Sequence, residues 1–393
     1  MSVPRLRILE VAALPFPSRQ GTQVMLHALC DGLAGRGHDV HLLTYAHGAF
    51  DLVPRYTLHR LRDFPRFRSL RSGPSWRRAA LDLSLAAEIR RLAGKLSPDV
   101  LHVHNVEAAA AALLVPPRPR LPCVFHSHNV MEDELPTYVE PLLRGPARAF
   151  GRWLDRALPR HADLTLAVSD ATRGALIRAG GDPARIVTTE PGIDLADVAS
   201  VAAPVPSDPR PATRDPRPVI GHVGNLDAYQ GLDLVVQALA RLRPCGVDPE
   251  LVLITESDPS PVLSMAARAG VRARSVAHGP PEYALRALAA CDAAVVARTV
   301  RGGFPIKLAV LLAAGVPVVA TPAAAGGLGI DDVAHVAGDA SPEALARAIR
   351  AALADPGRAE RAERGRRMAR DRWSAQAAAA RVERELIRVA GHS

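Results

Sequence analysis

The feature that most constrains the fold is an alternation of short apolar segments with longer amphipathic ones, which runs twice through the chain. In the first half, apolar runs at Arg7–Ala13 and Val40–Thr44 flank a segment, Met25 to Leu33, whose apolar residues recur at helical spacing. Strands that alternate with helices build a parallel sheet with both faces covered. Because the pattern restarts at Val219–Val223, we predict an α/β protein of two Rossmann-like domains.

A proline-rich stretch at residues 201–218 divides the two series, since its sequence can form neither a helix nor a central strand. We predict a first domain over residues 1–200, a second over 219–372, and a terminal segment, 373–393, formed by one long helix from Trp373 to Ala390. The two domains are expected to face each other across a cleft. Ligands of doubly wound sheets lie at the carboxyl ends of the strands, so the turns that follow strands are the candidate sites.

Composition and charge exclude several classes of protein. The formal net charge of +9 allows an anionic partner. However, aromatic residues make up only 4% and no nucleic-acid-binding module is present, so no nucleic acid is expected. No apolar run reaches the roughly 18–20 residues that span a bilayer. Glu10 and three prolines interrupt the N-terminus, which makes a poor signal peptide. Four widely spaced cysteines favour a reducing cytoplasm over a disulfide framework.

The turn after the first strand, PFPSRQGTQ, is the first candidate site. Gly21 would let the backbone approach a ligand, Thr22 would cap the following helix, and the helix amides would attract an anion. An ordinary strand-to-helix turn explains the same residues. The turn has no GxGxxG pattern, which argues against an NAD-dependent dehydrogenase.

Histidines cluster at two further strand ends, LHVHN (101–105) and FHSHN (125–129). We expect His104 and His128 to face the cleft, and His102 and His126 to alternate with them and face the packed side. The H-x-H spacing could suggest a metal, but no further ligand stands at a suitable spacing, so no metal site is predicted. His128 is predicted to bind substrate near the reacting centre.

The most informative stretch is GGFPIKLAVLLAAGVPVVAT (302–321). Pro305 suits a first helical turn, which places Lys307 in that turn, where a cation opposes the helix dipole. Only two of the 49 basic residues are lysines, so a lysine is not the default cation of this chain. A bound diphosphate would remove the conflict; a solvated surface lysine is the alternative. In the turn GNLDAYQG, Asn225 and Gln230 could donate hydrogen bonds to phosphate oxygens, or simply suit a tight turn.

Taken in order, these segments resemble a family-4-type glycosyltransferase of the GT-B fold over nearly the whole chain. The stretches that carry the resemblance are PFPSRQGTQVMLHALCDGLAGRGHDVHLLT, DVLHVHN, VFHSHNV, AVSDATRGAL, PGIDL, GNLDAYQGLDLVVQAL and GGFPIKLAVLLAAGVPVVAT. The terminal helix resembles the one that crosses back to the first domain in this family. The resemblance implies a first, acceptor-side domain and a second domain that binds a nucleotide sugar.

This chain departs from the family pattern at its donor helix. The family usually carries two glutamates eight residues apart, and the corresponding positions are Gly302 and Val310. Asn225 and Gln230 stand where the family has an arginine and a lysine. Lys307 would replace some of that charge, and Glu256, after the strand Leu251–Ile254, could take over a sugar or ribose contact.

The resemblance implies a retaining glycosyltransferase that moves a sugar from a nucleotide-diphosphate donor to a glycan, lipid-linked or small-molecule acceptor. Lys307 would stabilise the leaving diphosphate, and His128 would hold the transferred sugar. The resemblance also implies that no cofactor or metal is required. The expected donor-side contacts are Gly21, Thr22, Asn225, Gln230, Glu256, Gly303, Phe304, Pro305 and Ile306, and the expected acceptor-side contacts are His104 and Asn129.

The many arginines of Arg55–Arg91 suggest either a lipid-phosphate acceptor and peripheral contact with the anionic inner membrane face, or a solvated basic surface. Two alternatives to transfer remain open. The absent glutamates would suit a non-catalytic subunit that binds a sugar nucleotide, and the same architecture also serves nucleotide-sugar epimerases.

Overall fold

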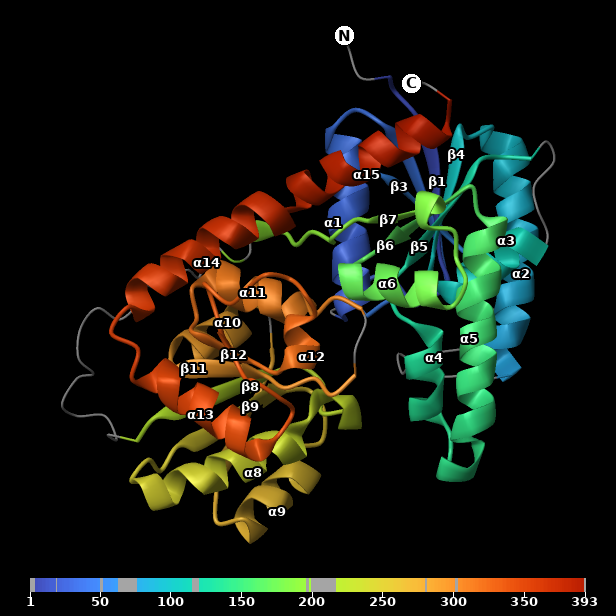
Figure 1. The fold of residues 1–393 in the computed structure, drawn as a ribbon. Coiled ribbons are helices and arrows are strands. Elements are labelled where there is room, and N and C mark those ends of the chain that lie inside the picture. Colours follow the sequence, from blue (N-terminus) through green and yellow to red (C-terminus); the bar gives the residue numbers. More distant parts are fainter. Residues whose placement is uncertain are drawn as a thin grey trace. The chain divides into compact units, whose positions relative to one another are not determined.

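The chain forms two compact units, shown in the computed structural model of Figure 1. The structure describes residues 4–391 except 19, 50–51, 63–75, 115–119, 196–197, 199–216, 280 and 301–302. Unit 1 comprises the described residues of Met1–Ile193, Gly302–Phe304 and Ala375–Ser393, and unit 2 those of Asp194–Arg301 and Pro305–Ser374. Most of the predicted linker, 201–218, lies outside the described residues.

Unit 1 is built on a seven-stranded sheet in the order β3-β2-β1-β4-β5-β6-β7, and every strand pair is parallel. This confirms the α/β class predicted from the alternating pattern. The strands are β1 (Arg7–Ala12), β2 (Asp39–Thr44), β3 (Thr57–Arg60), β4 (Val100–His104), β5 (Cys123–Ser127), β6 (Leu164–Ala167) and β7 (Ile186–Thr188). The central strands β4, β5 and β6 are buried along their whole length, as a covered parallel sheet requires.

Helices cover both faces of this sheet, and each face has its own apolar core. Side chains of α1 and α15 pack on one face, and side chains of α2, α3 and α5 pack on the other. The helices of unit 1 are α1 (Gly21–Gly35), α2 (Trp76–Leu96), α3 (Asn105–Leu114), α4 (Met131–Glu134), α5 (Arg144–His161), α6 (Asp170–Arg178) and α15 (Ala375–Val389), with 3-10 turns η1 (Leu135–Tyr138), η2 (Pro141–Leu143) and η3 (Pro183–Arg185).

The C-terminal helix packs directly on α1. A Cβ atom on Gly32 would lie 2.8 Å from the Cβ of Ala379, so the two helices approach closely only because residue 32 is glycine. Glu383 of α15 accepts hydrogen bonds from Arg36 (2.5 Å) and His38 (2.8 Å), just after the end of α1. α15 therefore forms part of the core of unit 1.

The prediction of one long helix from Trp373 to Ala390 is wrong at its start. Trp373 is the last residue of α14 (Arg358–Trp373), and α15 begins at Ala375. Ser374 between them is extended, with φ −68° and ψ 152°, so the helical hydrogen-bond ladder is broken there. α14 has no clear apolar pattern in the sequence because its composition is mostly charged, although its buried face includes Trp373.

Unit 2 is a second parallel sheet, in the order β10-β9-β8-β11-β12-β13. Its strands are β8 (Val219–Val223), β9 (Glu250–Thr255), β10 (Arg272–Ala277), β11 (Ala293–Val296), β12 (Val318–Ala320) and β13 (His335–Val336). Its other helices are α8 (Leu232–Leu242), α9 (Ser260–Arg268), α10 (Pro281–Ala289), α11 (Ile306–Ala314), α12 (Pro322–Ala325) and α13 (Pro342–Leu353), with turns η4 (Ala228–Gln230) and η5 (Arg243–Cys245).

The order of strands in unit 2 places the turns after β8 and β11 side by side, because these two strands are neighbours in the sheet. From β8 the chain continues to β9 and β10 on one side of the sheet and then to β11, β12 and β13 on the other. Ligands of doubly wound sheets bind at the point where the strand order reverses in this way. Among the described helices, none is both long and apolar enough to cross a membrane.

Candidate functional site

Lys307 begins a chain of hydrogen bonds at the carboxyl ends of β8 and β11. It lies in the first turn of α11, as predicted, and its Nζ donates to Gln230 Oε1 over 2.7 Å. The Gln230 amide donates in turn to Asn225 Oδ1 over 2.6 Å. The three polar residues that the sequence analysis selected in unit 2 are therefore one connected group.

Three further residues, Asp227, Tyr229 and Gly224, define the surroundings of this group. Asn225 Nδ2 donates to Asp227 (2.6 Å) and to the Tyr229 hydroxyl (3.1 Å), which fixes the turn after β8. Gly224 has φ +111°, and a Cβ atom there would lie 3.2 Å from Lys307 Nζ. A side chain at position 224 would therefore crowd the ammonium group. The glycine at this position leaves that space open next to the ammonium.

Lys307 is half-buried, and the loss of water around its ammonium lowers its pKa to about 7. The nearby charge of Arg298 acts in the same direction, whereas Asp227 opposes it. Burial, followed by the charge of Lys307, lowers the pKa of His222 on β8 to about 3, so this histidine is neutral. Lys307, when protonated, and Arg298 thus repel each other at the carboxyl edge of the sheet, and an anionic ligand would offset this repulsion.

Arg298 is a residue that the sequence analysis missed. It follows β11 directly, and its guanidinium lies 5.9 Å from the centre of the Tyr229 ring. In a chain with 47 arginines, composition gives no reason to single it out. Its place directly after the mostly apolar run 292–297, which predicts a strand, was the available signal.

Glu256 lies at the end of the neighbouring strand β9 rather than within the lysine group. Its carboxylate accepts a hydrogen bond from the Gly279 amide, 2.9 Å away, in the segment after β10. The carboxylate is exposed and keeps a second oxygen for a ligand. Of the remaining donor-side candidates, Pro305 precedes α11 and Ile306 is its first residue, while Gly303 (φ +67°) and Phe304 group with unit 1. Gly302 lies outside the described residues.

The turn at Gly21 and Thr22 differs from the prediction in one respect. Thr22 does not cap the helix, because α1 already begins at Gly21 and Thr22 is its second residue. The N-cap is Gln20, whose side chain makes no capping hydrogen bond. The first-turn amides of α1 therefore have no side-chain cap from that residue, which is compatible with an anion site.

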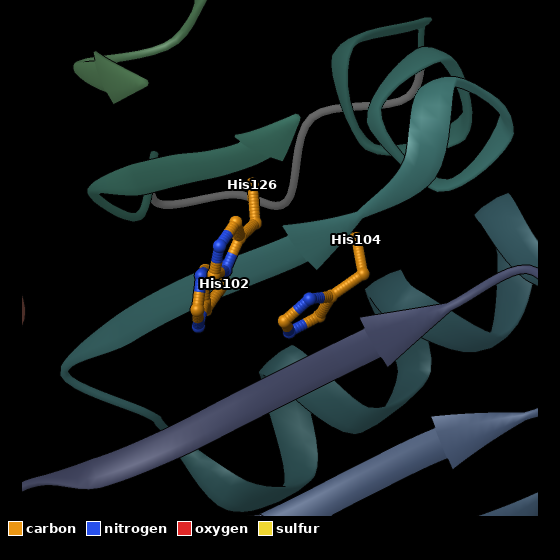
Figure 2. Close-up of side chains that lie close together, drawn as sticks. All are labelled: His102, His104 and His126. Atoms are coloured by element: carbon orange, nitrogen blue, oxygen red, sulfur yellow. The ribbon is translucent and has the colours of Figure 1, made fainter. Parts of the chain in front are cut away.

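The histidines of β4 and β5 gather on one face of the sheet, as Figure 2 shows for three of them. The expectation that His102 and His104 face opposite sides is wrong: residues two apart in a strand point to the same side. His104 pairs in register with His126, and His102 with Val124. His102, His104 and His126 consequently share the face that also carries Glu10 of β1.

Glu10 holds two of these histidines. Its Oε2 lies 2.6 Å from His104 Nε2 and 2.9 Å from His102 Nδ1. His104 Nδ1 lies 3.0 Å from His128 Nε2. Glu10, His102 and His104 are fully buried, and His128 is 7% exposed. A hydrogen-bonded row therefore leads from a buried carboxylate to the histidine at the strand end.

Burial and charge along this row determine which ring nitrogens carry a proton. Burial raises the pKa of Glu10, but the charge of His102 and the hydrogen bonds of both histidines bring it to about 2. Burial lowers the pKa of His104 and of His128. An ionised Glu10 accepts from His104 Nε2–H, so Nδ1 of a neutral His104 accepts from His128 Nε2–H. His128 Nδ1 is then left as a hydrogen-bond acceptor.

Three ring nitrogens, one each from His102, His104 and His126, lie within 4.8 Å of one another. Such a group can bind a transition metal. However, both nitrogens of His104 are already engaged, by Glu10 and by His128. A metal would have to displace one of these bonds, so the arrangement suits a proton-bearing network better than a metal cage. The other acceptor-side candidate, Asn129, is half-buried next to His128.

Comparison with known proteins identifies the class. The model of Glycosyltransferase Family 4 matches residues 19–197, and that of Glycosyl transferases group 1 matches residues 217–355. D-inositol 3-phosphate glycosyltransferase of Xylanimonas cellulosilytica is 31% identical over 75% of this chain and 73% of its own.

Solved structures share the architecture of the whole chain. Sucrose-phosphate synthase from Thermosynechococcus elongatus has a TM-score of 0.79 at 18% identity, covering 98% of this chain and 100% of that one. HepE from Anabaena in complex with UDP-glucose has a TM-score of 0.71 at 18% identity, covering 97% and 99%. The architecture is thus that of the GT-B glycosyltransferases, with two Rossmann-like domains. The chain belongs to glycosyltransferase family 4 and is a glycosyltransferase.

Proposed function

We propose that this enzyme transfers a hexosyl group, with retention of configuration, from a nucleotide-diphosphate sugar held by unit 2. The observation that carries the proposal is the hydrogen-bonded group of Lys307, Gln230 and Asn225 at the carboxyl edge of β8 and β11. Arg298 lies close enough for its charge to lower the pKa of Lys307. A diphosphate accepting hydrogen bonds from Lys307 would offset the mutual repulsion of the two cations. Negative charge grows on the diphosphate as the sugar leaves, so a cation there stabilises the transition state more than the ground state.

The amide residues have a supporting role in this proposal. Gln230 accepts from Lys307 and is itself held by Asn225, so the ammonium is directed by an amide oxygen rather than by a carboxylate. A lysine paired with a carboxylate would be less available to a phosphate. The proposed donor-side contacts are Lys307, Asn225 and Gln230, together with Glu256 and the segment Gly303–Ile306; an anion at Gly21 and Thr22 is part of the same proposal.

In unit 1, we propose that His128 holds the transferred sugar. Its Nδ1 is the acceptor left at the end of the row from Glu10, and it suits a sugar hydroxyl, which donates. No side chain in this row is placed as a carboxylate nucleophile, since Glu10 is fully buried and engaged by two histidines. This favours attack by the acceptor on the same face as the leaving diphosphate.

The acceptor is proposed to be a glycan, a lipid-linked sugar or a phosphorylated small molecule, with Asn129 on its side of the site. His104, the other acceptor-side candidate, is fully buried and bonded at both ring nitrogens, so it would act only by holding His128. The relative from Xylanimonas cellulosilytica is named for a phosphorylated acceptor, which is compatible with the basic segment Arg55–Arg91. Of that segment, residues 63–75 lie outside the described residues. The four described cysteines form no disulfide, and the enzyme is proposed to act in the cytoplasm.

A thermal-shift screen against UDP-, GDP-, ADP- and dTDP-sugars tests the donor site. A ligand at about 100 times its Kd should stabilise the folded protein by roughly 2.7 kcal/mol. We expect one nucleotide class to stabilise the wild type and Lys95→Ala, but not Lys307→Ala. Lys95 is the matched control because it is the other lysine of the chain and is exposed on α2.

Transfer is then measured with the nucleotide sugar that binds. If Lys307→Ala kept full turnover at saturating donor, the diphosphate role of Lys307 would be refuted. Binding without hydrolysis or transfer would favour the second candidate, a subunit that binds sugar nucleotides without catalysis. The observation behind that candidate is Val310, half-buried on α11 where the family resemblance implies a glutamate.

A further inference from the structure

A short segment of unit 1 carries the residues that are proposed to contact the transferred sugar and the acceptor. His128 and Asn129 follow β5 directly, and α4 begins two residues after Asn129, at Met131. The near end of this segment is held at two points. His128 Nε2 lies 3.0 Å from His104 Nδ1, and the Asn129 carbonyl accepts from the Ser127 hydroxyl over 3.0 Å. The place of Asn129 therefore also depends on what holds the far end, at α4.

A buried carboxylate holds the far end. Asp155 of α5 is 4% exposed. Its Oδ1 accepts from the Met131 amide over 2.9 Å, and its Oδ2 accepts from the Glu132 amide over 2.8 Å. Because each oxygen takes one amide, the carboxylate holds two consecutive peptide groups and restricts any shift of α4 along α5.

The backbones of α4 and α5 are also in close contact. Figure 1 shows the two helices side by side, and a Cβ atom on Gly151 would lie 2.2 Å from the Met131 carbonyl oxygen. Gly151 lies four residues before Asp155, so both are on the same side of α5. The missing side chain at position 151 lets α4 come close enough for a side chain as short as aspartate to reach its amides.

The surroundings of Asp155 oppose its charge. Burial raises the pKa of its carboxyl to about 6, and the charges of Glu132 and Asp133 act in the same direction, whereas the two amide bonds lower the pKa. Arg152 does not offset this, because it pairs with Glu132. An asparagine would have nearly the same shape and no buried charge, but it has one acceptor oxygen instead of two. What the aspartate adds at this position is therefore the second bond to α4, and not stability.

We propose that Asp155 is a positioning residue for acceptor binding: its two bonds to α4 set the place of Asn129 in the acceptor subsite. The inference rests on the function proposed above, which puts Asn129 on the acceptor side. His128 has its own anchor in His104, so a change at Asp155 should affect the acceptor more than the transferred sugar. Asp155 acts through α4 and needs no contact with either substrate.

Selective isotope labelling can follow Asn129 without any ligand. The chain contains two His–Asn pairs, His104–Asn105 and His128–Asn129. Labelling histidine carbonyls with ¹³C and asparagine amides with ¹⁵N therefore gives two signals in an NMR spectrum that selects labelled peptide bonds. In Asp155→Asn the Asn129 signal should shift. The Asn105 signal, at the end of the neighbouring strand β4, should stay in place.

Asp163→Asn is the matched control. Asp163 lies beside the start of β5, at the opposite end of the strand from His128, and its carboxylate accepts from the Cys123 amide over 2.8 Å. Like Asp155 it is an aspartate that holds a main-chain amide, but not an amide of α4. Its variant should leave both NMR signals in place. Asp155→Ser, which also offers a single acceptor oxygen, is a second variant and should shift the Asn129 signal as Asp155→Asn does.

Turnover separates positioning from stabilisation alone. It is measured with the nucleotide sugar that binds in the thermal-shift screen. The probe acceptor is D-inositol 3-phosphate, for which the relative from Xylanimonas cellulosilytica is named. In Asp155→Asn the KM of this acceptor should rise roughly tenfold, as expected for one lost hydrogen bond to Asn129, while the donor KM stays unchanged. The urea midpoint of unfolding should change little, because the variant loses one bond but no longer buries a charge.

Two results would overturn the positioning role. One is an unshifted Asn129 signal in both Asp155 variants. The other is an unchanged acceptor KM, which together with a lower unfolding midpoint would leave Asp155 a structural anchor only. If the wild type does not transfer to the probe acceptor, it is the proposed class of phosphorylated acceptors that loses its support, and the Asn129 signal alone decides the positioning role.

Discussion

Glu10 is a fully buried carboxylate on which two histidines depend, and Glu10→Gln keeps its shape while removing its charge. Glutamine offers one acceptor oxygen and one donating amide where glutamate offers two acceptors. If the amide nitrogen takes the place of Oε2, the atom that lies close to both histidines, at least one of them must turn a lone pair towards it. If His104 does so, its Nδ1 becomes a donor, and the acceptor role passes to His128 Nε2. The variant therefore tests both the stability of the sheet and the proton order of the row.

The expected loss follows from the pKa of Glu10. A carboxyl whose pKa falls from 4.5 to about 2 on folding contributes about 3 kcal/mol at neutral pH. Because the pKa is lower in the folded state, this contribution to stability is fully present well above the unfolded-state pKa of 4.5. It is lost as the pH falls towards the folded-state value of about 2. At pH 3 about half of it should remain. The difference between wild type and Glu10→Gln in denaturant unfolding should shrink accordingly.

Hydrogen exchange read by mass spectrometry separates the two units. If the strands of unit 1 exchange by global opening of that unit, about 3 kcal/mol corresponds to roughly a hundredfold faster exchange of β1, β4 and β5 at pH 7. Strands β8 and β9 of unit 2 serve as the internal control. Glu140→Gln, at an exposed carboxylate, should leave all strands unchanged. Unchanged protection of β1 in Glu10→Gln would refute the stabilising role of the Glu10–histidine pairs.

Three more outcomes are expected. Donor affinity should fall as the pH rises above about 7, because Lys307 is deprotonated there and only its ammonium attracts a diphosphate; calorimetry in two buffers should show proton uptake on binding, and Lys307→Arg should abolish the pH dependence. His128→Ala should lower kcat about tenfold through one lost hydrogen bond to the sugar; steady-state turnover equal to wild type would contradict that role. Gly151→Ala should destabilise unit 1 by about 2 kcal/mol in denaturant unfolding, because its Cβ would meet the Met131 carbonyl; Gly145→Ala, which has open space, should cost far less.

The fold could be predicted because its signal is local. The apolar runs that became β1, β2, β4, β5 and β8 are each set off by turn residues, and their alternation with helices implies a parallel sheet. Lys307 could be predicted for a similar reason, since a proline at the start of an apolar run fixes where the helix begins. Elements whose signal is weak in sequence were missed. β10, with its exposed arginines, is held by its pairing with β9, and the highly charged α14 is held by the packing of its few buried residues.

The histidine row was only half predictable. His104 and His128 were selected for their positions at strand ends, but Glu10 was noticed only as an interruption of an apolar N-terminus. A single carboxylate inside the strand RILEVA is the signal that was available. Its partners stand more than ninety positions away along the chain, and only the strand order β1-β4-β5 brings them together. Registers between strands cannot be derived from one sequence by periodicity alone.

The packing of α15 on α1 has a consequence for the synthesis of the protein. Unit 1 is encoded mainly in two widely separated pieces, Met1–Ile193 and Ala375–Ser393, and most of unit 2 is synthesised between them. Until the second piece is made, Leu26, Leu29 and Leu33 of α1 lack part of their apolar cover, which includes Val382 and Leu386. Hence residues 1–193 alone, although they hold the entire first sheet, should be a poor candidate for expression as an independent domain. A fragment in which residues 375–393 are joined to that piece would be the better choice.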